Sequence, residues 1–441
     1  MKFDRNNLDH LTACEDCDLL LPATEAPPNH SVVCPRCGAV ISRRSTHSIA
    51  KTLALSITGL LLYLPALSLP LMTFESFGFS DSASVIDSIL IFLHNGYYFV
   101  SFMVLISALI FPFILLSLIF TISLQLRRNQ YPSVLAKLFR TYLKLEEWAM
   151  VEVYLLGIMI TVIKMSDTAD IHYHAGIFCF SALVLISMAI TTVIDKDFFW
   201  KKIENRGKKP HNQPADLFSK GGQNFITAAE NNLFLCHICH KLSPASITLC
   251  PRCGDSLHSR KPKSIARTWA LVITSALFFI PANIMPIMQV DFLGVPDKST
   301  IIDGIIYFFH SGSYLIGLVI FTASILVPLF KIVGLIILLL TTRPCTPKYL
   351  RQKATMFRFI AFIGRWSMLD IFVIALLTVL VDFGFLTSIH AAPAATYFCF
   401  VVASTMLAAI TFDPRIMWDK CNPYRQNVVF IQQHPWKNHH D

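Results

Sequence analysis

The sequence predicts an all-α polytopic membrane protein with two homologous four-helix transmembrane units, each preceded by a small cytoplasmic zinc-ribbon domain with four cysteine ligands. Two observations lead to this fold class. Of the 441 residues, 54% are hydrophobic and only 15% are charged. With a mean hydropathy of +0.55, the chain is too apolar for an ordinary soluble protein. The second observation is that the two halves of the chain repeat each other.

The repeat begins at a cysteine knuckle and continues through the membrane segments. Cys34-Pro35-Arg36-Cys37-Gly38 recurs unchanged as Cys250-Pro251-Arg252-Cys253-Gly254. Beyond it, prolines, tryptophans and single polar residues recur at an offset that drifts by only about two residues, including Pro65 with Pro281, Pro112 with Pro328, Trp148 with Trp366 and Trp200 with Trp418. A repeat of this length indicates two homologous modules rather than a solenoid of short units.

Eight apolar stretches are long enough to cross a bilayer as helices, which takes roughly 20 residues. The first 46 residues are polar and carry cysteines, so we expect no cleavable signal peptide. The expected spans are 51–72, 99–126, 147–165 and 175–194 in the first half and 267–288, 314–341, 366–385 and 392–412 in the second.

Lysine and arginine placement predicts the orientation of these spans. The segments before the first span, between spans two and three, between the halves, between spans six and seven, and after the last span are all basic. Taken together, the alternate loops carry Asp and Glu residues and a single lysine, Lys298. By the positive-inside bias, both termini and both cysteine modules are expected in the cytoplasm. The net charge of +9 is therefore explained by the basic segments expected on the cytoplasmic side of the membrane. We expect no nucleic-acid partner.

Four Cys-x-x-Cys pairs predict two metal sites with four thiolate ligands each. Pro and Gly in the second knuckle of each module favour the tight turn that tetrahedral Zn²⁺ requires. A disulfide framework and a rubredoxin-like iron site are the alternatives. His237 and His240 lie in and beside a knuckle, but with four cysteines present we expect them to face solvent. The expected ligands are Cys14, Cys17, Cys34 and Cys37 in the first site and Cys236, Cys239, Cys250 and Cys253 in the second.

After the first span of each half, a short amphipathic helix is expected along the outer face. Ser84-x-x-Asp87 and Thr300-x-x-Asp303 are typical of a capping box, and the apolar residues that follow have helical spacing. The helices end at His94 and His310, each followed two residues later by Gly. We interpret these histidines as helix ends rather than as ligands.

Ionisable side chains within spans are costly and therefore suggest function. Glu152 and Asp370 occupy matching positions in the two halves. Lys331 lies deep in the sixth span, whereas its counterpart in the first half is Leu115. Asp370 is the natural partner for this lysine, with Thr405 at a comparable depth. The cluster either holds the helices together or binds a ligand.

This pattern resembles the paraquat-inducible protein A family. The resemblance rests on the paired knuckles before each membrane unit and on Gly364-Arg365-Trp366-Ser367-Met368-Leu369-Asp370, and it covers nearly the whole chain. It implies an inner-membrane partner of MCE-domain proteins that carry lipid between the bacterial membranes. It also implies Lys331, Asp370 and Thr405 as lipid-site candidates in the second unit, with Glu152 as the matching position in the first.

The expected function is therefore that of a non-enzymatic subunit passing phospholipid to or from a periplasmic MCE-domain partner. No Gly-x-x-x-x-Gly-Lys-Ser/Thr motif occurs, so the chain carries no signature of an ATPase. The alternatives are a membrane scaffold and a redox or electron-transfer protein with thiolate-bound metal. The expected domains are a zinc ribbon at 1–46, a membrane unit at 47–200, a linker and second ribbon at 201–262, a second membrane unit at 263–418, and a cytoplasmic tail at 419–441.

Overall fold

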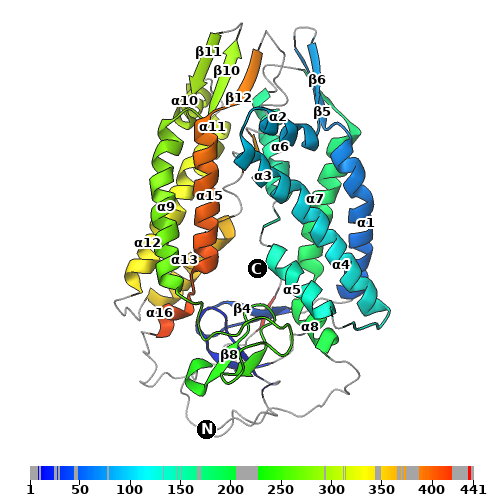
Figure 1. Ribbon diagram of the computed structural model, residues 1–441, viewed down its shortest axis with the longest axis vertical. Coiled ribbons are helices and arrows are strands. Elements are labelled where there is room, and N and C mark those ends of the chain that lie inside the picture. The colour runs from blue at the N-terminus through cyan, green and yellow to red at the C-terminus, as the bar shows by residue number, and fades with distance from the viewer. Residues whose placement is uncertain are drawn as a thin grey trace.

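The computed structural model shows two helical membrane units side by side, with small sheets at one end and two cysteine ribbons at the other (Figure 1). These are called the sheet end and the ribbon end below. The residues that it describes are 8, 11–23, 27, 30–43, 48–76, 79–132, 134–146, 148–149, 151–165, 170–204, 227–292, 295–310, 312, 314–342, 349–364, 369, 372–373, 387–419 and 436–438.

The first membrane unit, unit 1, is a bundle in which α1 packs against both α4 and α7. Its second spanning helix, Tyr98–Arg127, is continuous from α3 through a π-helical segment into α4. The helices of unit 1 are α1 (Ser48–Ser68), α2 (Val85–His94), α3 (Tyr98–Val104), α4 (Phe111–Arg127), α5 (Leu135–Glu146), α6 (Val151–Met165), α7 (Ala175–Val193) and α8 (Lys196–Glu204).

The second unit, unit 2, repeats this order, and α9 packs against α12 and α15 as α1 does against α4 and α7. Its described helices are α9 (Ser264–Ile284), α10 (Ile301–His310), α11 (Tyr314–Phe321), α12 (Val327–Thr341), α13 (Leu350–Ile363), α15 (Pro393–Thr411) and α16 (Arg415–Asp419).

Six described helices, rather than eight, are long and apolar enough to span a membrane. The helix at the third predicted span is α6, which has 15 residues. At 1.5 Å per residue it covers roughly 22 Å, less than the hydrocarbon core of a bilayer. The rest of the third predicted span, 147–165, stays a prediction, and the seventh predicted span, 366–385, lies almost entirely outside the described residues. The six spans are 48–68, 98–127, 175–193, 264–284, 317–341 and 393–411.

Both long central helices contain a π-helical segment at the same place in the repeat. The segments are Leu105–Ile110 and Thr322–Leu326, and each is followed directly by the helix that carries Pro112 or Pro328 at its start. Proline has no backbone N–H to donate to the preceding turn. The wider π turn accommodates this missing bond without ending the helix, so the repeated prolines explain the repeated π segments.

The first and last spanning helices of each unit are joined by one serine. The Ser48 hydroxyl donates to the Val193 carbonyl (2.8 Å) and accepts from the Asp195 backbone N–H (3.0 Å). Ser264 makes the same pair of bonds with the Thr411 carbonyl (2.9 Å) and the Asp413 N–H (2.9 Å). The ribbon end of each bundle is thereby closed in the same way.

The sheet end contains the predicted short helices together with strands that the sequence analysis did not predict. Both capping boxes are confirmed, because the backbone N–H and hydroxyl of Ser84 and of Thr300 donate to the Asp87 and Asp303 carboxylates. The segments expected as loops form two three-stranded antiparallel sheets, ordered β6-β5-β7 and β11-β10-β12. Their strands are β5 (Met72–Ser76), β6 (Phe79–Ala83), β7 (Asp170–Tyr173), β10 (Met288–Phe292), β11 (Val295–Ser299) and β12 (Thr387–Ala391).

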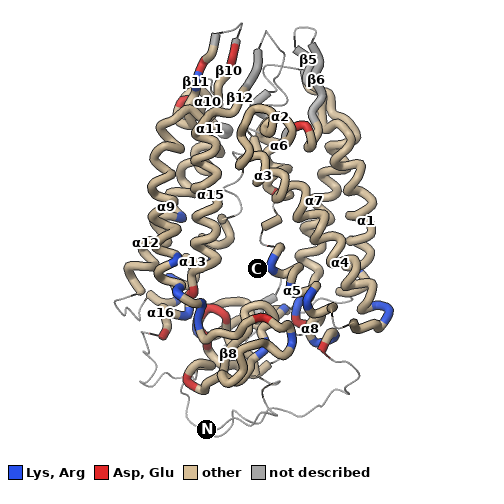
Figure 2. Tube along the Cα trace, viewed as in Figure 1, with Lys and Arg blue, Asp and Glu red and all other residues tan. Residues whose placement is uncertain are grey.

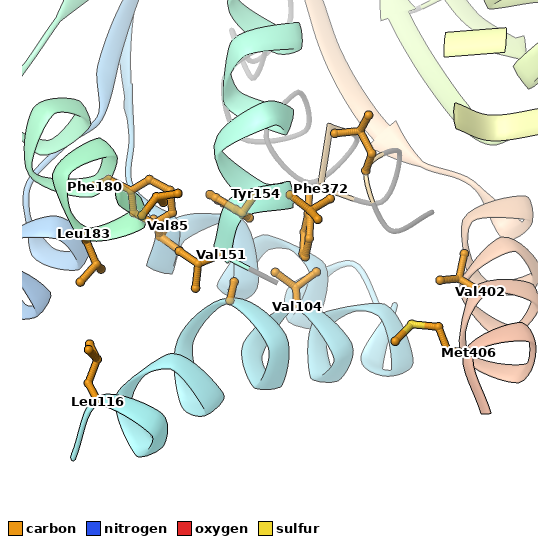
Figure 3. Packing of buried hydrophobic residues seen from close by; sticks show 14 of the residues in the cluster. Val85, Val104, Leu116, Val151, Tyr154, Phe180, Leu183, Phe372, Val402 and Met406 are labelled. Atoms are coloured by element: carbon orange, nitrogen blue, oxygen red, sulfur yellow. The ribbon is translucent and has the colours of Figure 1, made fainter. Parts of the chain in front are cut away.

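The two units meet through aromatic and aliphatic side chains near α3 and α15. Phe99 of unit 1 stacks on Phe400 of unit 2 with ring centroids 4.2 Å apart, and Tyr154 meets Phe372 edge-on at 5.2 Å. Val104 and Met406 belong to the same buried cluster (Figure 3). The apolar core of unit 1 therefore continues into unit 2.

Gly176 provides a test of the packing between α7 and the segment that directly follows α1. A Cβ at this position would collide with the Pro70 carbonyl and lie 2.7 Å from the Leu69 carbonyl, both of which are backbone atoms. We expect Gly176→Ala to lower stability by about 1–3 kcal/mol, as overpacking does. The control is Gly304→Ala in α10, where nothing lies within 4 Å; it should leave the thermal unfolding midpoint in detergent unchanged or slightly raised. An equal effect of both substitutions would contradict the packing.

Candidate functional site

The eight predicted cysteine ligands form two buried clusters. In each cluster the four Sγ atoms lie within 4.8 Å of one another, and the sulfur pairs that contact are 3.4–3.6 Å apart. A tetrahedral Zn²⁺ with Zn–S bonds of about 2.3 Å would give sulfur separations of roughly 3.8 Å. The clusters therefore fit a four-thiolate metal ion with only a small adjustment.

Each knuckle is closed by a residue in the left-handed conformation directly after its second cysteine. These residues are Asp18 (φ 61°), Gly38 (φ 75°), His240 (φ 53°) and Gly254 (φ 71°). In all four turns, the backbone N–H of this residue donates to the carbonyl of the first cysteine at 2.8–3.0 Å. Glycine takes this conformation without strain, which explains the repeated Gly, whereas Asp18 and His240 are held there by their side-chain contacts.

The first ribbon, ribbon 1 (residues 11–43), packs against unit 2 rather than against the unit that follows it in the chain. Arg358 of α13 donates to the Asp16 carboxylate (2.8 Å) and to the Cys37 carbonyl (3.1 Å). The Arg36 guanidinium lies 4.5 Å from the ring centroid of Trp418 in α16. The cysteines of this ribbon share one buried cluster with Leu338 and other residues of unit 2.

The second ribbon, ribbon 2 (residues 227–257), makes the reciprocal contacts with unit 1. Glu204 of α8 pairs with Lys241 and accepts from Arg252 (2.6 Å). Asp255 accepts from Lys144 of α5 at 2.9 Å. The cysteines of this ribbon belong to the buried cluster of unit 1. The two ribbons are therefore crossed, each lying on the homologous surface of the other half.

The ribbons also contact each other. Leu19 pairs with Thr227 in an isolated β-bridge, and strands β1 (Leu11–Ala13), β2 (Leu20–Pro22), β8 (Leu233–Leu235) and β9 (Leu242–Pro244) share a small buried apolar cluster. His240 of ribbon 2 pairs with Glu15 of ribbon 1.

The expectation that both histidines near the knuckles face solvent is wrong. His240 joins the two ribbons, and His237 lies beside Arg415, with Nε2 and the guanidinium 2.9 Å apart. Neither is needed as a ligand where four cysteines converge. They serve instead as contacts between domains.

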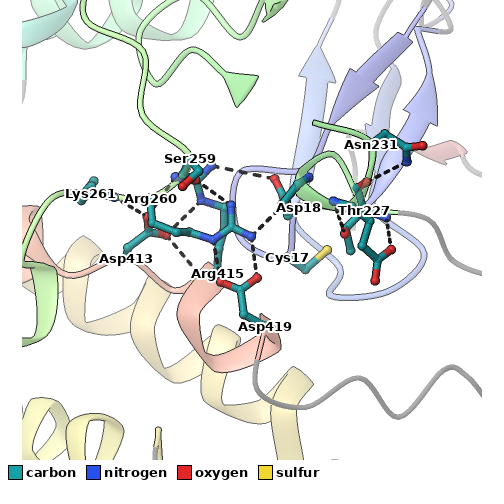
Figure 4. Close-up of polar contacts among 12 residues, drawn as sticks. Cys17, Asp18, Thr227, Asn231, Ser259, Arg260, Lys261, Asp413, Arg415 and Asp419 are labelled. Carbon is teal, nitrogen blue, oxygen red and sulfur yellow. Dashed lines mark hydrogen bonds and ion pairs between the residues drawn. The ribbon is translucent and has the colours of Figure 1, made fainter. Parts of the chain in front are cut away.

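A buried ion network joins both ribbons to unit 2 (Figure 4). Arg415, 1% exposed, donates to both carboxylate oxygens of Asp413 (3.0 and 2.9 Å). Its other terminal nitrogen is 3.9 Å from Asp18 of ribbon 1. Asp18 also accepts from Arg260 (3.0 Å) and from the Ala229 N–H of ribbon 2 (3.1 Å). One aspartate thus contacts ribbon 2, the segment before α9, and unit 2.

The Asp413 carboxylate stays ionised at all physiological pH values. Burial raises its pKa, but hydrogen bonds and the charge of Arg415 outweigh this effect and lower the pKa to about 2. A folded-state pKa below the unfolded value of about 3.9 means that the interaction stabilises the fold above that value. The stabilisation is lost only as the pH falls toward 2.

The polar residues predicted within the spans are placed as follows. Lys331 on α12 and Thr405 on α15 are both completely buried in unit 2, and these two helices pack together. Glu152 lies in the first turn of α6 in unit 1. Asp370 lies outside the described residues.

The ion network of Asp18, Arg260, Asp413 and Arg415 was not predicted from the sequence. Basic residues at the ends of spans indicate the orientation of the spans in the membrane. The sequence therefore does not distinguish Arg415, which forms a buried ion pair, from the other basic residues at these ends. The available signal was the recurrence of Ser48 and Asp195 as Ser264 and Asp413, which marks the end of the last span as a structured junction.

Comparisons with known proteins agree on one family. The family described as Paraquat-inducible protein A matches residues 49–204 and 265–422. Intermembrane transport protein PqiA of Escherichia coli K12 is 30% identical over 92% of this chain and 95% of its own length. Lipophilic envelope-spanning tunnel protein A of the same strain is 32% identical over 92% and 90%. A probable intermembrane transport protein of Haemophilus influenzae is 28% identical over 92% and 95%. No solved structure matches.

Removing Arg415 tests the buried network. Arg415→Ala leaves the Asp413 carboxylate buried without its guanidinium, which we expect to cost about 3–5 kcal/mol of unfolding free energy. The control is Lys196→Ala, which breaks the exposed pair of Lys196 with Glu146 (2.8 Å) and should cost less than about 1 kcal/mol. Denaturant or thermal unfolding of purified protein measures both. Equal costs would show that the network contributes nothing special to the fold.

Proposed function

The chain belongs to the paraquat-inducible protein A family, and we propose that it is the inner-membrane subunit of a system that carries phospholipid between membranes. In this proposal it passes lipid to or from a periplasmic MCE-domain partner. The support is the family itself, whose relatives are named as intermembrane transport and envelope-spanning tunnel proteins. The multi-pass architecture, with helices long enough to span a bilayer, suits a subunit that takes lipid from one membrane.

Charge placement supports an orientation with the ribbons in the cytoplasm. Lysine and arginine gather at the ribbon end of both units (Figure 2). They include residues of the short helices α5 and α13, such as Lys144 and Arg358. The positive-inside bias places this end in the cytoplasm and the sheet end in the periplasm, where an MCE-domain partner would meet it.

The lipid site is proposed in unit 2, and the observation that carries it is the complete burial of Lys331 within a membrane-spanning helix. An ammonium group at this depth is costly and is typically retained for function. Thr405, also fully buried, lies on the helix that packs against α12. With Asp370 as the acid that pairs with Lys331, these residues would hold the phospholipid headgroup, and Glu152 marks the matching position in unit 1. Leu115 at the position of Lys331 shows that the bundle forms without the lysine.

The metal in the ribbons is proposed to be Zn²⁺. Structural zinc sites typically have four protein ligands, which leave no coordination position open for water. Residues outside the ligand set support the same role, because Arg36 and Arg252 donate to the carbonyls of Cys17 and Cys239 and hold the paired knuckles together. Zinc would supply fold stability rather than chemistry, in keeping with relatives named as transporters rather than as enzymes.

Lipid binding tests the site in unit 2. We expect Lys331→Ala and Asp370→Asn each to reduce the phospholipid that copurifies with the protein at least fivefold and to weaken envelope integrity. The matched control is Lys51→Ala, which removes an exposed lysine of α1. Lipid extraction with mass spectrometry and growth on detergent plates measure the two effects. If both variants retained lipid and barrier function, the site assignment would be wrong.

Metal analysis tests the zinc assignment. The purified protein should be colourless and contain about two zinc ions per chain. Cys14→Ser and Cys250→Ser should each lose about one of them, since each removes a ligand from a different cluster. A coloured protein that contains iron would favour the electron-transfer alternative.

A further inference from the structure

The short helices α2 and α10 have apolar side chains on two separate faces. Both helices lie at the sheet end of their units, beneath the strands (Figure 1). One apolar face packs into the bundle and is at most 8% exposed; it consists of Val85, Ile89 and Phe92 in α2 and of Ile301, Ile305 and Phe308 in α10. The other apolar face, called the outer stripe below, is 40–50% exposed; it consists of Ile86, Leu90 and Leu93 in α2 and of Ile302, Ile306 and Phe309 in α10.

The two outer stripes occupy the same place in the repeat. In each stripe the second residue follows the first by four positions and the third follows the second by three, so the three side chains lie on one side of the helix. Single apolar residues are normal on the surface of a protein. A continuous apolar stripe that recurs in both halves instead indicates a surface that contacts an apolar medium or a partner.

The side of each helix that lies opposite the bundle is polar. At about 100° per residue, Asp87 and His94 lie opposite the buried face of α2, with the outer stripe between the two. Asp303 and His310 take these positions in α10, where both are exposed. Each helix therefore has one side for the protein core, one for an apolar medium and one for water, as helices at a membrane interface do.

The adjoining spanning helices place α2 and α10 at the depth of the lipid headgroups. The spanning helix Tyr98–Arg127 has 30 residues and is therefore about 45 Å long. This length matches the hydrocarbon core of a bilayer together with both headgroup layers, roughly 40–45 Å. The first turn of the helix then lies among the headgroups, and α2 packs against this part, α3. In unit 2, α10 packs against α11 in the same way.

The outer stripe of α10 joins the apolar surface of a spanning helix. Phe309 of the stripe meets Tyr314 of α11 with ring centroids 6.1 Å apart. Tyr314 and Leu318 of α11 are exposed, as are the matching residues Tyr98 and Phe102 of α3. Exposed apolar side chains on a spanning helix face acyl chains, and tyrosine is enriched at the level of the headgroups. The medium beside the outer stripes is therefore the one that surrounds the spanning helices.

We propose that α2 and α10 insert their outer stripes among the acyl chains of the leaflet at the sheet end. The polar sides, with Asp87 and Asp303, stay at the headgroups and hold each helix at the boundary between headgroups and acyl chains. Short apolar helices of this length are typical of interfacial segments rather than of spans. Insertion depends on neither the orientation of the chain nor the molecule that it carries; in the orientation proposed above, this leaflet is the periplasmic one.

Photocrosslinking in the full-length protein tests the insertion. The photoreactive residue p-benzoylphenylalanine replaces Leu90 or Ile306, each in the middle of an outer stripe. In the matched controls it replaces His94 or His310 on the polar side of the same helix. Each protein is reconstituted into vesicles of equal parts phosphatidylethanolamine and phosphatidylglycerol, and mass spectrometry measures the yield of lipid adducts.

Two further positions define the range of the measurement. Leu61 is exposed in the spanning helix α1 and reports full contact with acyl chains, whereas Asp297 is exposed in β11 and reports none. The yield at positions 90 and 306 should approach that at 61 and exceed that at 94, 310 and 297 at least fivefold. The melting temperature shows whether each variant is folded, and Ile86 and Ile302 replace positions 90 and 306 if those variants unfold.

Lipid adducts at 90 and 306 that are no more frequent than at 297 would overturn the proposal. Crosslinks between two copies of the chain, or crosslinks to another protein when intact cells are irradiated, would overturn it too if they replaced the lipid adducts, because the stripes would then be protein interfaces. Adducts at only one of the two positions would overturn it for the other helix. Positions 90 and 306 are not part of the proposed lipid site, so each of these results leaves the proposed function as it stands.

Discussion

The crossed packing of the two ribbons is the constraint on which the arrangement of the membrane units depends. Ribbon 1 precedes unit 1 in the chain but contacts α13 and α16 of unit 2. Ribbon 2 precedes unit 2 but contacts α5 and α8 of unit 1. Since the ribbons also share a core, each unit is tied to both ribbons and, through them, to the other unit. Four cysteines converge in each ribbon, so a metal ion bound there and the placement of the units would belong to one cooperative structure.

Comparison of the two homologous halves distinguishes features that support the fold from residues that differ between the units. Features present in both halves have structural explanations: the serine that joins the first and last spanning helices, the capping boxes, and the π segments before Pro112 and Pro328. The buried lysine is present in one half only. Two bundles with the same scaffold can therefore carry different polar groups at matching positions of the repeat.

Features that depend on residues close together in the chain could be predicted from the sequence. Cysteine spacing located both clusters of four cysteines. Ser84 with Asp87 and Thr300 with Asp303 predicted the short helices correctly, because capping depends on residues three positions apart. The sheets were missed, because their third strands β7 and β12 come from distant parts of the chain. The crossing could not be predicted either. The surfaces that receive the ribbons are homologous, so only side-chain contacts such as Arg358 with Asp16 decide which ribbon packs on which unit.

Hydrogen–deuterium exchange of single-site metal variants tests the crossed arrangement most directly. Cys17→Ser disrupts the cysteine cluster of ribbon 1 and should increase deuterium uptake in α13 and α16 of unit 2. These helices are distant in the chain, since Asp16 of ribbon 1 and its partner Arg358 in α13 are 342 residues apart. Cys239→Ser should increase uptake in α5 and α8 of unit 1. If each variant instead loosened the unit that directly follows its own ribbon, the crossed arrangement would be wrong.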